Sequence, residues 1–304
     1  MCGIAAILYK NNVLNAPVGP HLVSMLQSLR HRGSDSTGVT IYSSNNKSNE
    51  LIIILRITSF KYDKAVLKTN LTQLIQSQGS QIQEFNFTEN HIKLIITNIK
   101  NIKTLAEQIK SIGNLEIDSI GSNSQVIKDT GDAKDLDNKH NISQISGSHG
   151  IGHVRLATES IVDVTHSHPF WAYPFPDITV VHNGQLTNYR SLKRFYESKS
   201  HKFQTHNDSE LIAVYLADKL ANNLSLKEAL NQSLVDLDGS YTYLVSTKDG
   251  LGFAKEKWSF KPLVLMERKD IIALASEEIA LRQVFPEEID RLEPQENEVM
   301  TWKI

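Results

Sequence analysis

Short apolar runs alternate with polar and glycine-containing segments along the chain, and their lengths and spacing separate strands from helices. Continuous apolar or β-branched runs of strand length occupy residues 4–8, 38–42 and 51–57. A helical spacing of three and four residues is found instead in one early group, Leu22, Met25, Leu26 and Leu29. The segment HRGSDSTG follows it, so this part of the sequence predicts a helix that ends in a loop.

The composition changes from about Ser43 to Ser146, where Asn, Gln, Ser, Ile and Lys dominate. Within this segment, residues 92–96 predict a strand and residues 102–112 predict a helix, which together would form a small inserted α/β unit. The polar stretch Gly121–Ser143 is predicted to be a mobile loop or linker. No chemistry is assigned to the inserted segment.

The second half of the chain again combines strand and helix patterns. A strand and turn are predicted at residues 178–189, and a helix should begin near Asn207 and Asp208 and run through ELIAVYLADKLA. The remaining predicted elements are strands at residues 240–247, 262–266, 271–275 and 298–304 and a short helix at 277–284. Many strands with flanking helices predict a layered α+β domain.

Composition and charge exclude several classes of protein. The 304 residues are 40% hydrophobic and 22% charged, as in a soluble globular protein, and the net charge of −2 predicts neither a nucleic-acid nor a membrane partner. The longest apolar run, Leu51–Leu55, is far shorter than the roughly 20 residues of a membrane span, and no signal-peptide core is found. A single cysteine excludes an internal disulfide, so the cytoplasm is the expected compartment.

That single cysteine is Cys2, directly behind Met1. One interpretation is an accidental surface thiol. The other is that removal of Met1 makes Cys2 the first residue, which places a nucleophile and a free α-amino group on one residue. An α-amino group has a pKa of about 7.7–8.0, so it can accept the thiol proton near neutral pH. Such N-terminal activation is a known scheme for thiol nucleophiles.

A thiol nucleophile that attacks an amide also needs hydrogen-bond donors for the oxyanion. The HNG at His182–Gly184 follows β-branched residues, so it is predicted to lie at a strand end. There Asn183 offers its side-chain N–H and Gly184 its backbone N–H. The alternative interpretation of the same residues is an ordinary Asn-Gly hairpin turn.

An α-amino-acid substrate requires a cation for its carboxylate and an anion for its ammonium group. Arg155 could bind a carboxylate through two hydrogen bonds, although a surface salt bridge would explain it equally well. Asp208 could bind the ammonium group, or could simply cap a helix. A metal cluster is not expected, because carboxylates at ligand spacing are missing around the histidines, which include His153, His166, His168 and His182.

Six motifs in a fixed order resemble the class II glutamine amidotransferases, a family of N-terminal-nucleophile hydrolases. They are MCGI, RGSDSTG, GHVRLAT, SHPF, VVHNGQLTNY and NDSELIA, and they cover the first fifty residues and then His149 to about Glu278. The resemblance implies a four-layer αββα sandwich over residues 1–304, interrupted by the insertion at about 43–146. It also implies hydrolysis of L-glutamine to glutamate and ammonia through a γ-glutamyl thioester.

The resemblance assigns a role to each candidate. Cys2 matches the nucleophile, with its own α-amine as the base, and Asn183 and Gly184 match the oxyanion-hole pair. Arg155 matches the arginine that holds the α-carboxylate of glutamine, and Asp208 matches the aspartate that binds its amino group. Two further residues join the substrate-binding candidates: His182, and the mainly structural Arg32 of RGSDSTG.

The resemblance extends to one type of amidotransferase. The run HVRLATESIVDVTHSHPFWAYPFPD resembles stand-alone amidotransferase subunits of split glutamate synthase and N-methylglutamate synthase systems, and about twenty residues after the last predicted helix are too few for a synthase domain. We therefore expect a separate synthase partner that accepts ammonia. A flavin or iron–sulfur cofactor would belong to that partner, and none is expected in this chain.

Two alternatives remain open at this stage. The chain could be an N-terminal-nucleophile hydrolase that cleaves another amide, or a non-catalytic regulatory subunit that retains the fold. The insertion is expected either to cover the mouth of the active site or to bind the partner.

Overall fold

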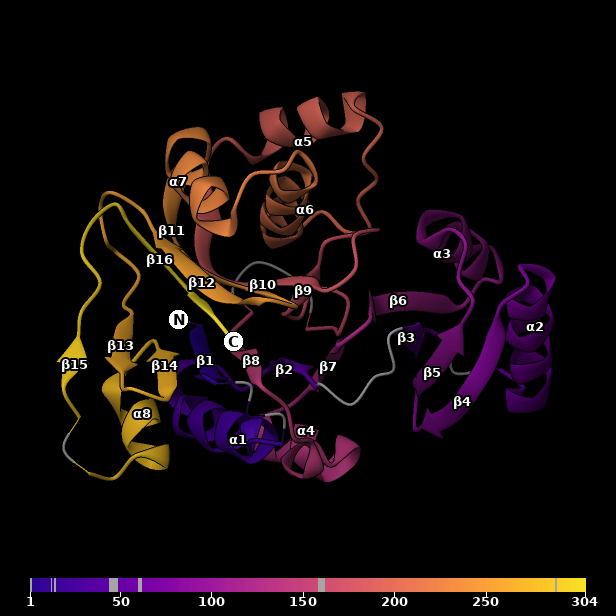
Figure 1. The fold of residues 1–304 in the computed structure, drawn as a ribbon, viewed down its shortest axis with the longest axis horizontal. Helices are drawn as coiled ribbons and strands as arrows, with labels where there is room; N and C mark the ends of the chain where they lie inside the picture. Colours follow the sequence, from indigo (N-terminus) through magenta and orange to yellow (C-terminus); the bar gives the residue numbers. More distant parts are fainter. Residues whose placement is uncertain are drawn as a thin grey trace.

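Two β-sheets stack face to face, and helices cover the outer face of each (Figure 1). The computed structural model describes residues 2–11, 13, 15–43, 49–59, 62–157, 162–287 and 289–304. In the view of Figure 1 the layers follow one another as helices, sheet, sheet and helices from top to bottom. This arrangement confirms the predicted four-layer αββα sandwich and its α+β class.

The first sheet has seven strands and places the start of the chain at its centre. Strand β1 (Gly3–Tyr9) pairs with β14 (Ile271–Ala275) on one side and β8 (His149–Arg155) on the other. The outer strands of this antiparallel sheet are β2 (Ser36–Tyr42), β7 (Ser124–Thr130), β13 (Val264–Glu267) and β15 (Arg291–Leu292). All seven residues of β1 are buried, so Cys2 is held at the edge of a rigid layer.

The second sheet has five strands, in the order β16, β12, β11, β10 and β9. Their bounds are Glu298–Lys303, Gly250–Lys255, Gly239–Thr247, Ile178–Leu186 and Phe170–Trp171, respectively. Apolar side chains from the facing strands of both sheets form one buried cluster, with Ile4, Leu8, Val181 and Phe253 among its members. Burial of this cluster joins the two sheets.

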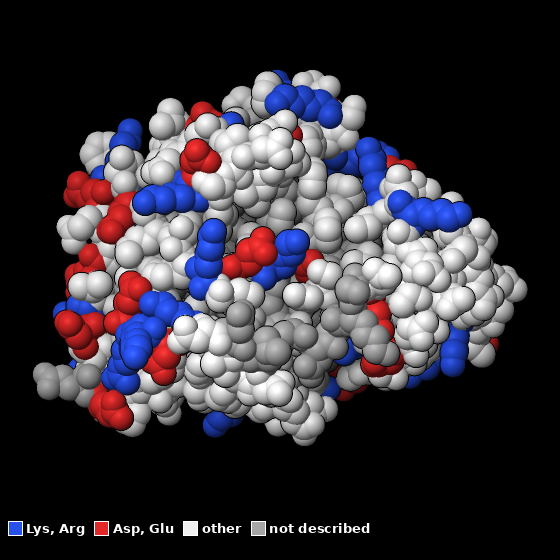
Figure 2. Space-filling model, in the orientation of Figure 1, with Lys and Arg blue, Asp and Glu red and all other residues white. Residues whose placement is uncertain are grey.

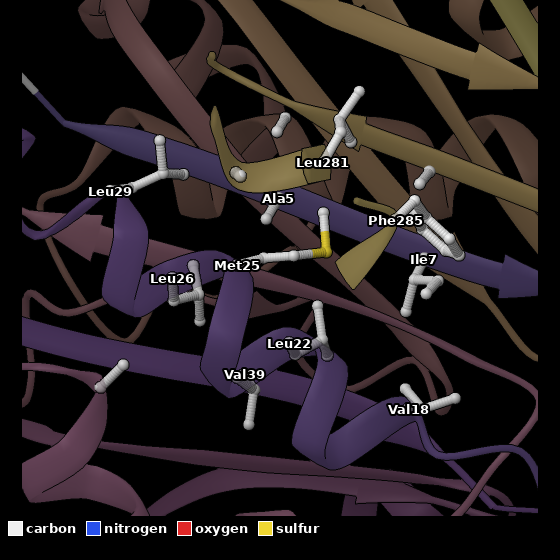
Figure 3. Packing of buried hydrophobic residues seen from close by; sticks show 14 of the residues in the cluster. Ala5, Ile7, Val18, Leu22, Met25, Leu26, Leu29, Val39, Leu281 and Phe285 are labelled. Atoms are coloured by element: carbon white, nitrogen blue, oxygen red, sulfur yellow. The ribbon is translucent and has the colours of Figure 1, made fainter. Parts of the chain in front are cut away.

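Helices α1 (Val18–Ser28), α4 (Ala133–His140) and α8 (Glu278–Val284) cover the seven-stranded sheet. Leu22, Met25 and Leu26 of α1 are fully buried, because the predicted helical spacing puts them on one face. Figure 3 shows this face packed between β1 and α8, where the labelled partners are Ala5, Ile7, Leu281 and Phe285. The short 3₁₀ helix η1 (Arg30–Arg32) follows α1 and leads toward Cys2.

Helices α5 (Tyr189–Ser198), α6 (Asp208–Ala221) and α7 (Leu226–Asp236) cover the five-stranded sheet. Helix α6 is the central one, and its residues from Ser209 to Ala217 are all buried. The side chain of Asn207 accepts a hydrogen bond from the backbone N–H of Ser209 and so caps this helix. The start of α6 is therefore fixed at a defined place beside β10.

Residues 50–121 form a separate layered unit beside the sandwich, on the right in Figure 1. Its elements are β3 (Glu50–Ile57), α2 (Lys64–Ser77), β4 (Gln81–Thr88), β5 (His91–Thr97), α3 (Ile102–Ser111) and β6 (Leu115–Gly121). The four strands make one antiparallel sheet with its own apolar core, which also takes in Trp171 and Tyr173 of the sandwich. The strand predicted at residues 92–96 and the helix predicted at 102–112 are present in this unit as β5 and α3.

The prediction of a loop at Gly121–Ser143 is wrong. This stretch contains β7, α4 and the 3₁₀ helix η2 (Ile142–Gln144), all of which belong to the sandwich. The buried polar groups of β7 have partners that the composition does not reveal. Lys128 Nζ donates to Ser167 O at 3.0 Å, and the Asp129 carboxylate accepts from Lys139 Nζ at 3.3 Å. Thus the inserted unit ends at residue 121 rather than near 146.

The surface shows a mixed distribution of charge. On the face shown in Figure 2, described Lys and Arg side chains lie among described Asp and Glu side chains rather than in one extended field. This agrees with the small net charge of the chain. In the described part of the chain, no helix has the length and apolar character needed to cross a membrane.

The buried face of α1 should contribute strongly to stability. We expect Leu26→Ala to lower the free energy of unfolding by about 3 kcal/mol, because it leaves a cavity against β8, where Gly152 has no side chain to fill it. Urea denaturation measures this change. The matched variant Leu292→Ala, at a leucine that is 51% exposed, should change it by no more than about 0.5 kcal/mol. Equal effects of the two variants would contradict the assignment of this core.

Candidate active site

Cys2 lies at the edge of a pocket of about 500 Å³ where β8, β10 and the start of α6 converge. Its thiol donates to the carbonyl oxygen of Leu156, with the sulfur and oxygen atoms 3.8 Å apart. The other lining residues are Arg155, Leu156, Ala157, His168, His182, Gly184, Gln185, Leu186, Tyr189, His206, Asn207, Asp208 and Ser209. The fold thus brings Cys2, Arg155, His182, Gly184 and Asp208 to one place from four separate parts of the sequence.

The backbone of Cys2 is held by the two candidates that do not line this pocket. Arg32 Nε and Asn183 Nδ2 both donate to the carbonyl oxygen of Cys2, at 2.9 and 3.1 Å. Arg32 is only 8% exposed and also donates to Glu277 Oε1 at 2.5 Å. The structure therefore places Arg32 and Asn183 as contacts that fix the residue carrying the thiol.

Ser276 and Glu277 belong to this arrangement, although the sequence did not single them out. Ser276 Oγ accepts hydrogen bonds from Ile4 N at 2.9 Å and from Asn183 Nδ2 at 3.2 Å, and so ties β1 to β10. Burial tends to raise the pKa of the Glu277 carboxyl, but Arg32 and His31 outweigh burial and hold this pKa below its usual value. Only the pairing of β14 with β1 brings these residues to Cys2.

The HNG lies inside β10, not at a strand end as predicted. Asn183 and Gly184 pair with Thr242 and Tyr241 of β11, and the strand continues to Leu186. The hairpin-turn interpretation is therefore wrong. Gly184 has φ +130°, and an added Cβ would lie 1.9 Å from the carbonyl oxygen of Ser240, so this position requires glycine.

Asp208 is the first residue of α6 and is not its cap, since Asn207 has that role. Its Oδ2 accepts from the backbone N–H of Leu186 at 2.9 Å, and its Oδ1 lies 3.6 Å from His182 Nδ1. Burial tends to raise the pKa of the Asp208 carboxyl, but His182 and the backbone N–H groups of Leu186 and Ser209 hold this pKa below its usual value. Asp208 is therefore a carboxylate at neutral pH.

Arg155 ends β8 and is 6% exposed, so it is a buried residue rather than a surface one. The RGSDSTG segment packs directly on this strand end. Asp35 N donates to Arg155 O at 3.0 Å, and Asp35 Oδ2 accepts from Ala157 N at 2.8 Å. An added Cβ on Gly33 would lie 2.4 Å from the Arg155 carbonyl carbon, which explains the glycine in this loop. Thr158, the last residue of the GHVRLAT motif, and the following residues 159–161 lie outside the described residues, as does Met1.

Three histidines near the pocket are buried, His153, His168 and His182, and the last two line it. The rings of His153 and His168 stack with centroids 4.0 Å apart, and His182 N donates to His168 Nδ1 at 3.2 Å. Burial lowers the pKa of His153 to about 3 and that of His168 well below its usual value, so both rings are neutral near pH 7. Across the described ranges, no three His, Cys, Asp or Glu side chains are grouped to hold a metal ion.

The chemistry of the pocket suits one class of ligand. It presents a thiol, a guanidinium group and an ionised carboxylate on one continuous lining. The guanidinium group can bind a carboxylate and the carboxylate can bind an ammonium group, so an α-amino acid would be oriented with its side chain free to reach the thiol. None of the described lining residues comes from the inserted unit, so that unit does not form the mouth as defined by these residues.

Comparison with known proteins identifies similar sequences over the whole chain. A family model described as "Glutamine amidotransferase domain" matches residues 153–283. A "Putative glutamine amidotransferase" of Methanothermobacter thermautotrophicus is 38% identical over 97% of this chain and 98% of its own length. The "Glutamine amidotransferase-like protein GlxB" of Rhizobium meliloti is 31% identical over 99% of this chain and 98% of its own length.

Solved structures share the fold at low sequence identity. The glutamine phosphoribosylpyrophosphate amidotransferase from B. subtilis, complexed with ADP and GMP, superimposes with a TM-score of 0.63 and 19% identity. A structure of the allosteric regulatory enzyme of purine biosynthesis gives a TM-score of 0.65, also at 19% identity. In both cases the match covers 99% of this chain and 47% of the other chain. At this identity the likeness supports the four-layer fold.

The lowered pKa of Asp208 predicts a pH-dependent contribution to stability. Because the folded-state pKa lies below 3.8, the ionised carboxylate stabilises the folded state above about pH 4, and this stabilisation is lost as the pH falls through the folded-state pKa. We expect the difference in unfolding free energy between wild type and Asp208→Asn to be constant near neutral pH and to shrink below about pH 4. Urea unfolding at a series of pH values measures it.

The neighbouring variant Asn207→Ala is the control for this experiment. It removes the helix cap without removing a titrating group, so its cost of about 1 kcal/mol should not depend on pH. A pH-independent difference for Asp208→Asn as well would show that the carboxylate is not stabilised in the fold.

Proposed function

This chain belongs to the class II glutamine amidotransferases and is an enzyme of that type, and from this premise we propose that it hydrolyses L-glutamine at Cys2 to glutamate and ammonia. One observation supports the proposal most directly. The only thiol of the chain shares a pocket with Arg155 and Asp208, the two groups that an α-amino acid requires. A hydrolase for an unrelated amide would need neither of them.

In the proposed reaction, Met1 is removed and the free α-amine of Cys2 accepts the thiol proton. The thiolate attacks the side-chain carbonyl carbon of glutamine, and the tetrahedral oxyanion is stabilised by hydrogen bonds. Collapse of this intermediate forms the thioester and breaks the C–N bond, and the amine returns its proton so that ammonia leaves. Water then hydrolyses the thioester, which releases glutamate and regenerates the thiol.

The oxyanion donors in this scheme are the backbone N–H of Gly184 and the side chain of Asn183. Gly184 lines the pocket, whereas Asn183 Nδ2 donates to Cys2 O and Ser276 Oγ in the present structure. We therefore propose that the Asn183 amide turns toward the pocket when glutamine binds. His182 would act by orienting Asp208 and Ser209, which it contacts through Nδ1, rather than by exchanging protons with substrate.

The proposed acceptor of the ammonia is a separate synthase chain of the glutamate synthase type. Support comes from residues 153–177, which resemble the stand-alone amidotransferase subunits of such systems. In this proposal a flavin or iron–sulfur centre belongs to the partner, and this chain contributes only protein groups. The single cysteine suits a reducing compartment, so we place both chains in the cytoplasm.

The proposal predicts that ammonia release depends on Cys2. Wild-type protein should convert glutamine to glutamate and ammonia, and Cys2→Ala should reduce the rate to that of buffer, because the alanine variant cannot form the thioester. Intact-mass analysis should show that Met1 is absent and that a glutamine-mimicking diazo-ketone adds once, at Cys2. Equal, nonzero rates for the two proteins, or a retained Met1 on active protein, would contradict the mechanism.

Recognition of the α-amino acid predicts a second pattern. Arg155→Lys keeps the positive charge but loses the paired hydrogen bonds to a carboxylate, so we expect KM for glutamine to rise about 30-fold or more. Asp208→Asn should raise KM similarly, because it removes the charge opposite the ammonium group. Steady-state kinetics measure both effects. Unchanged KM values in folded variants would point to another amide as the substrate.

A further inference from the structure

A second cavity, of about 270 Å³, lies between the inserted unit and the sandwich, and none of its lining residues lines the pocket of Cys2. Charged side chains from both parts line it. Arg56, Lys110, Glu116 and Asp118 come from the inserted unit, and Lys128 and Glu210 come from the sandwich. Neither Lys128 nor Glu210 lines the pocket of Cys2. Each forms a hydrogen bond with a segment that contributes residues to that pocket.

Lys128 holds the segment that carries His168. This lysine is 5% exposed on β7, and its ammonium group donates to the carbonyl oxygens of Ser167 at 3.0 Å and Pro169 at 3.5 Å. Those carbonyls flank His168, a lining residue of the pocket. The counter-charge is supplied by the inserted unit, where Asp118 Oδ1 lies 3.7 Å from Lys128 Nζ.

Arg56 of the inserted unit lies in the same group of charges as Lys128 and Asp118. Its Nε donates to Asp118 Oδ2 at 3.3 Å, and it also forms an ion pair with Glu116. Thr165 Oγ1 donates to Glu116 Oε2 at 3.0 Å, which adds a contact to the chain just before His168. Residues 165–169 thus contact the inserted unit in two ways. The direct contact is the hydrogen bond from Thr165 to Glu116, and the indirect one runs through Lys128, which pairs with Asp118.

Glu210 holds a second segment of the pocket lining. It is 1% exposed on α6, and its carboxylate accepts from Gln204 N at 2.6 Å and from Thr205 N at 2.7 Å. Residues 206–208, which follow directly, line the pocket and include Asp208. Lys110 of α3 lines the same cavity as Glu210, and its ammonium group lies 4.2 Å from the centre of the Tyr173 ring.

Each of these two buried charges therefore has an opposite charge of the inserted unit nearby: Asp118 lies 3.7 Å from Lys128, and Lys110 lines the same cavity as Glu210. A buried charge without an opposite charge is costly, so the surrounding structure shifts to reach water or another partner. Burial raises the pKa of Glu210 and lowers that of Lys110, while their mutual attraction opposes both shifts. Loss of either compensating charge would accordingly displace a pocket wall.

We propose that the inserted unit 50–121 sets the affinity of the pocket for glutamine, with Lys128 and Glu210 as positioning residues and Asp118 and Lys110 as their counter-charges. This inference rests on the proposed function, because it takes glutamine as the occupant of the pocket. None of these four residues lines the pocket of Cys2, so they act through His168 and Asp208. The expected signature is weaker binding with an intact chemical step.

Lys110→Met is the first test, because Lys110 is only partly buried and its replacement should fold. We expect KM for glutamine to rise about tenfold, equivalent to ~1.4 kcal/mol, with kcat within about twofold of wild type. Lys110→Arg should restore KM because it restores the charge. Asp118→Asn should raise KM by the same factor, because it removes the counter-charge of Lys128, which holds the segment of His168. Thermal unfolding checks that each variant is folded.

Glu107→Gln is the matched control. Glu107 lies on the same helix as Lys110 and also pairs with the sandwich, through Lys202 at 2.7 Å, but this ion pair is exposed. Its removal should leave KM unchanged. If Glu107→Gln raised KM as much as Lys110→Met, the effect would belong to the interface in general and the inference would be wrong.

Labelling of Cys2 by the diazo-ketone compares the affinity of wild type and variants for a glutamine analogue, and it requires no acceptor chain. The half-saturating concentration should rise about tenfold for Lys110→Met, whereas the rate of alkylation by iodoacetamide, which needs no amino-acid site, should not change. A wild type that neither releases ammonia nor reacts with the diazo-ketone would refute the proposed function itself. A reactive wild type with unchanged values in folded Lys110→Met and Asp118→Asn would refute only the role of the inserted unit.

Discussion

The site depends on how the backbone of Cys2 is anchored. A residue at the end of a chain ordinarily frays, because few contacts hold it. Here the Cys2 carbonyl accepts two hydrogen bonds, one from Arg32 after α1 and one from Asn183 in the second sheet. The bond from the charged Arg32 contributes about 1.5–3 kcal/mol and the bond from the neutral Asn183 about 0.5–1.5 kcal/mol, enough to oppose the entropy of one terminal residue. The thiol is therefore positioned by both sheets at once, and displacement of either sheet would displace it.

Electrostatics then separate the charged groups of the pocket from the neutral ones. Asp208 keeps a lowered pKa because backbone N–H groups and His182 favour its ionised form despite burial. Burial lowers the pKa values of His153 and His168, so both rings are uncharged near neutral pH. With these rings neutral, the guanidinium group of Arg155 and the carboxylate of Asp208 are the charges that would orient an amino acid in the pocket. The lowered pKa values also make both rings poor proton acceptors, which is consistent with the proposal that the α-amine of Cys2 is the base.

Local patterns in the sequence predicted the elements whose burial is regular. The helical spacing from Leu22 to Leu29 became α1, and the run at 51–57 became β3, because each has one face or both faces buried. The stretch Gly121–Ser143 failed for a physical reason: Lys128 is buried in a strand, and its partners lie at positions 118, 167 and 169. Ser276 could not be found either, since it meets Ile4 across 272 residues of sequence through strand pairing alone. The motif order predicted Cys2, Arg155 and Asp208 as parts of one site, and all three line one pocket, whereas the contacts that hold their segments depend on the tertiary fold.

The inserted unit is joined to the sandwich by apolar packing as well as by charge. Trp171 and Tyr173, which follow the His168 segment, are buried in the core of the inserted unit rather than in that of the sandwich. The chain therefore runs from the pocket wall directly into a core that the insertion provides. Close-packed cores transmit displacement instead of absorbing it, so a rotation of residues 50–121 would move this wall. If the proposed partner chain binds the inserted unit, it would therefore change glutamine affinity without touching the pocket, because the packing and the counter-charges that hold the pocket lining lie where the two parts meet.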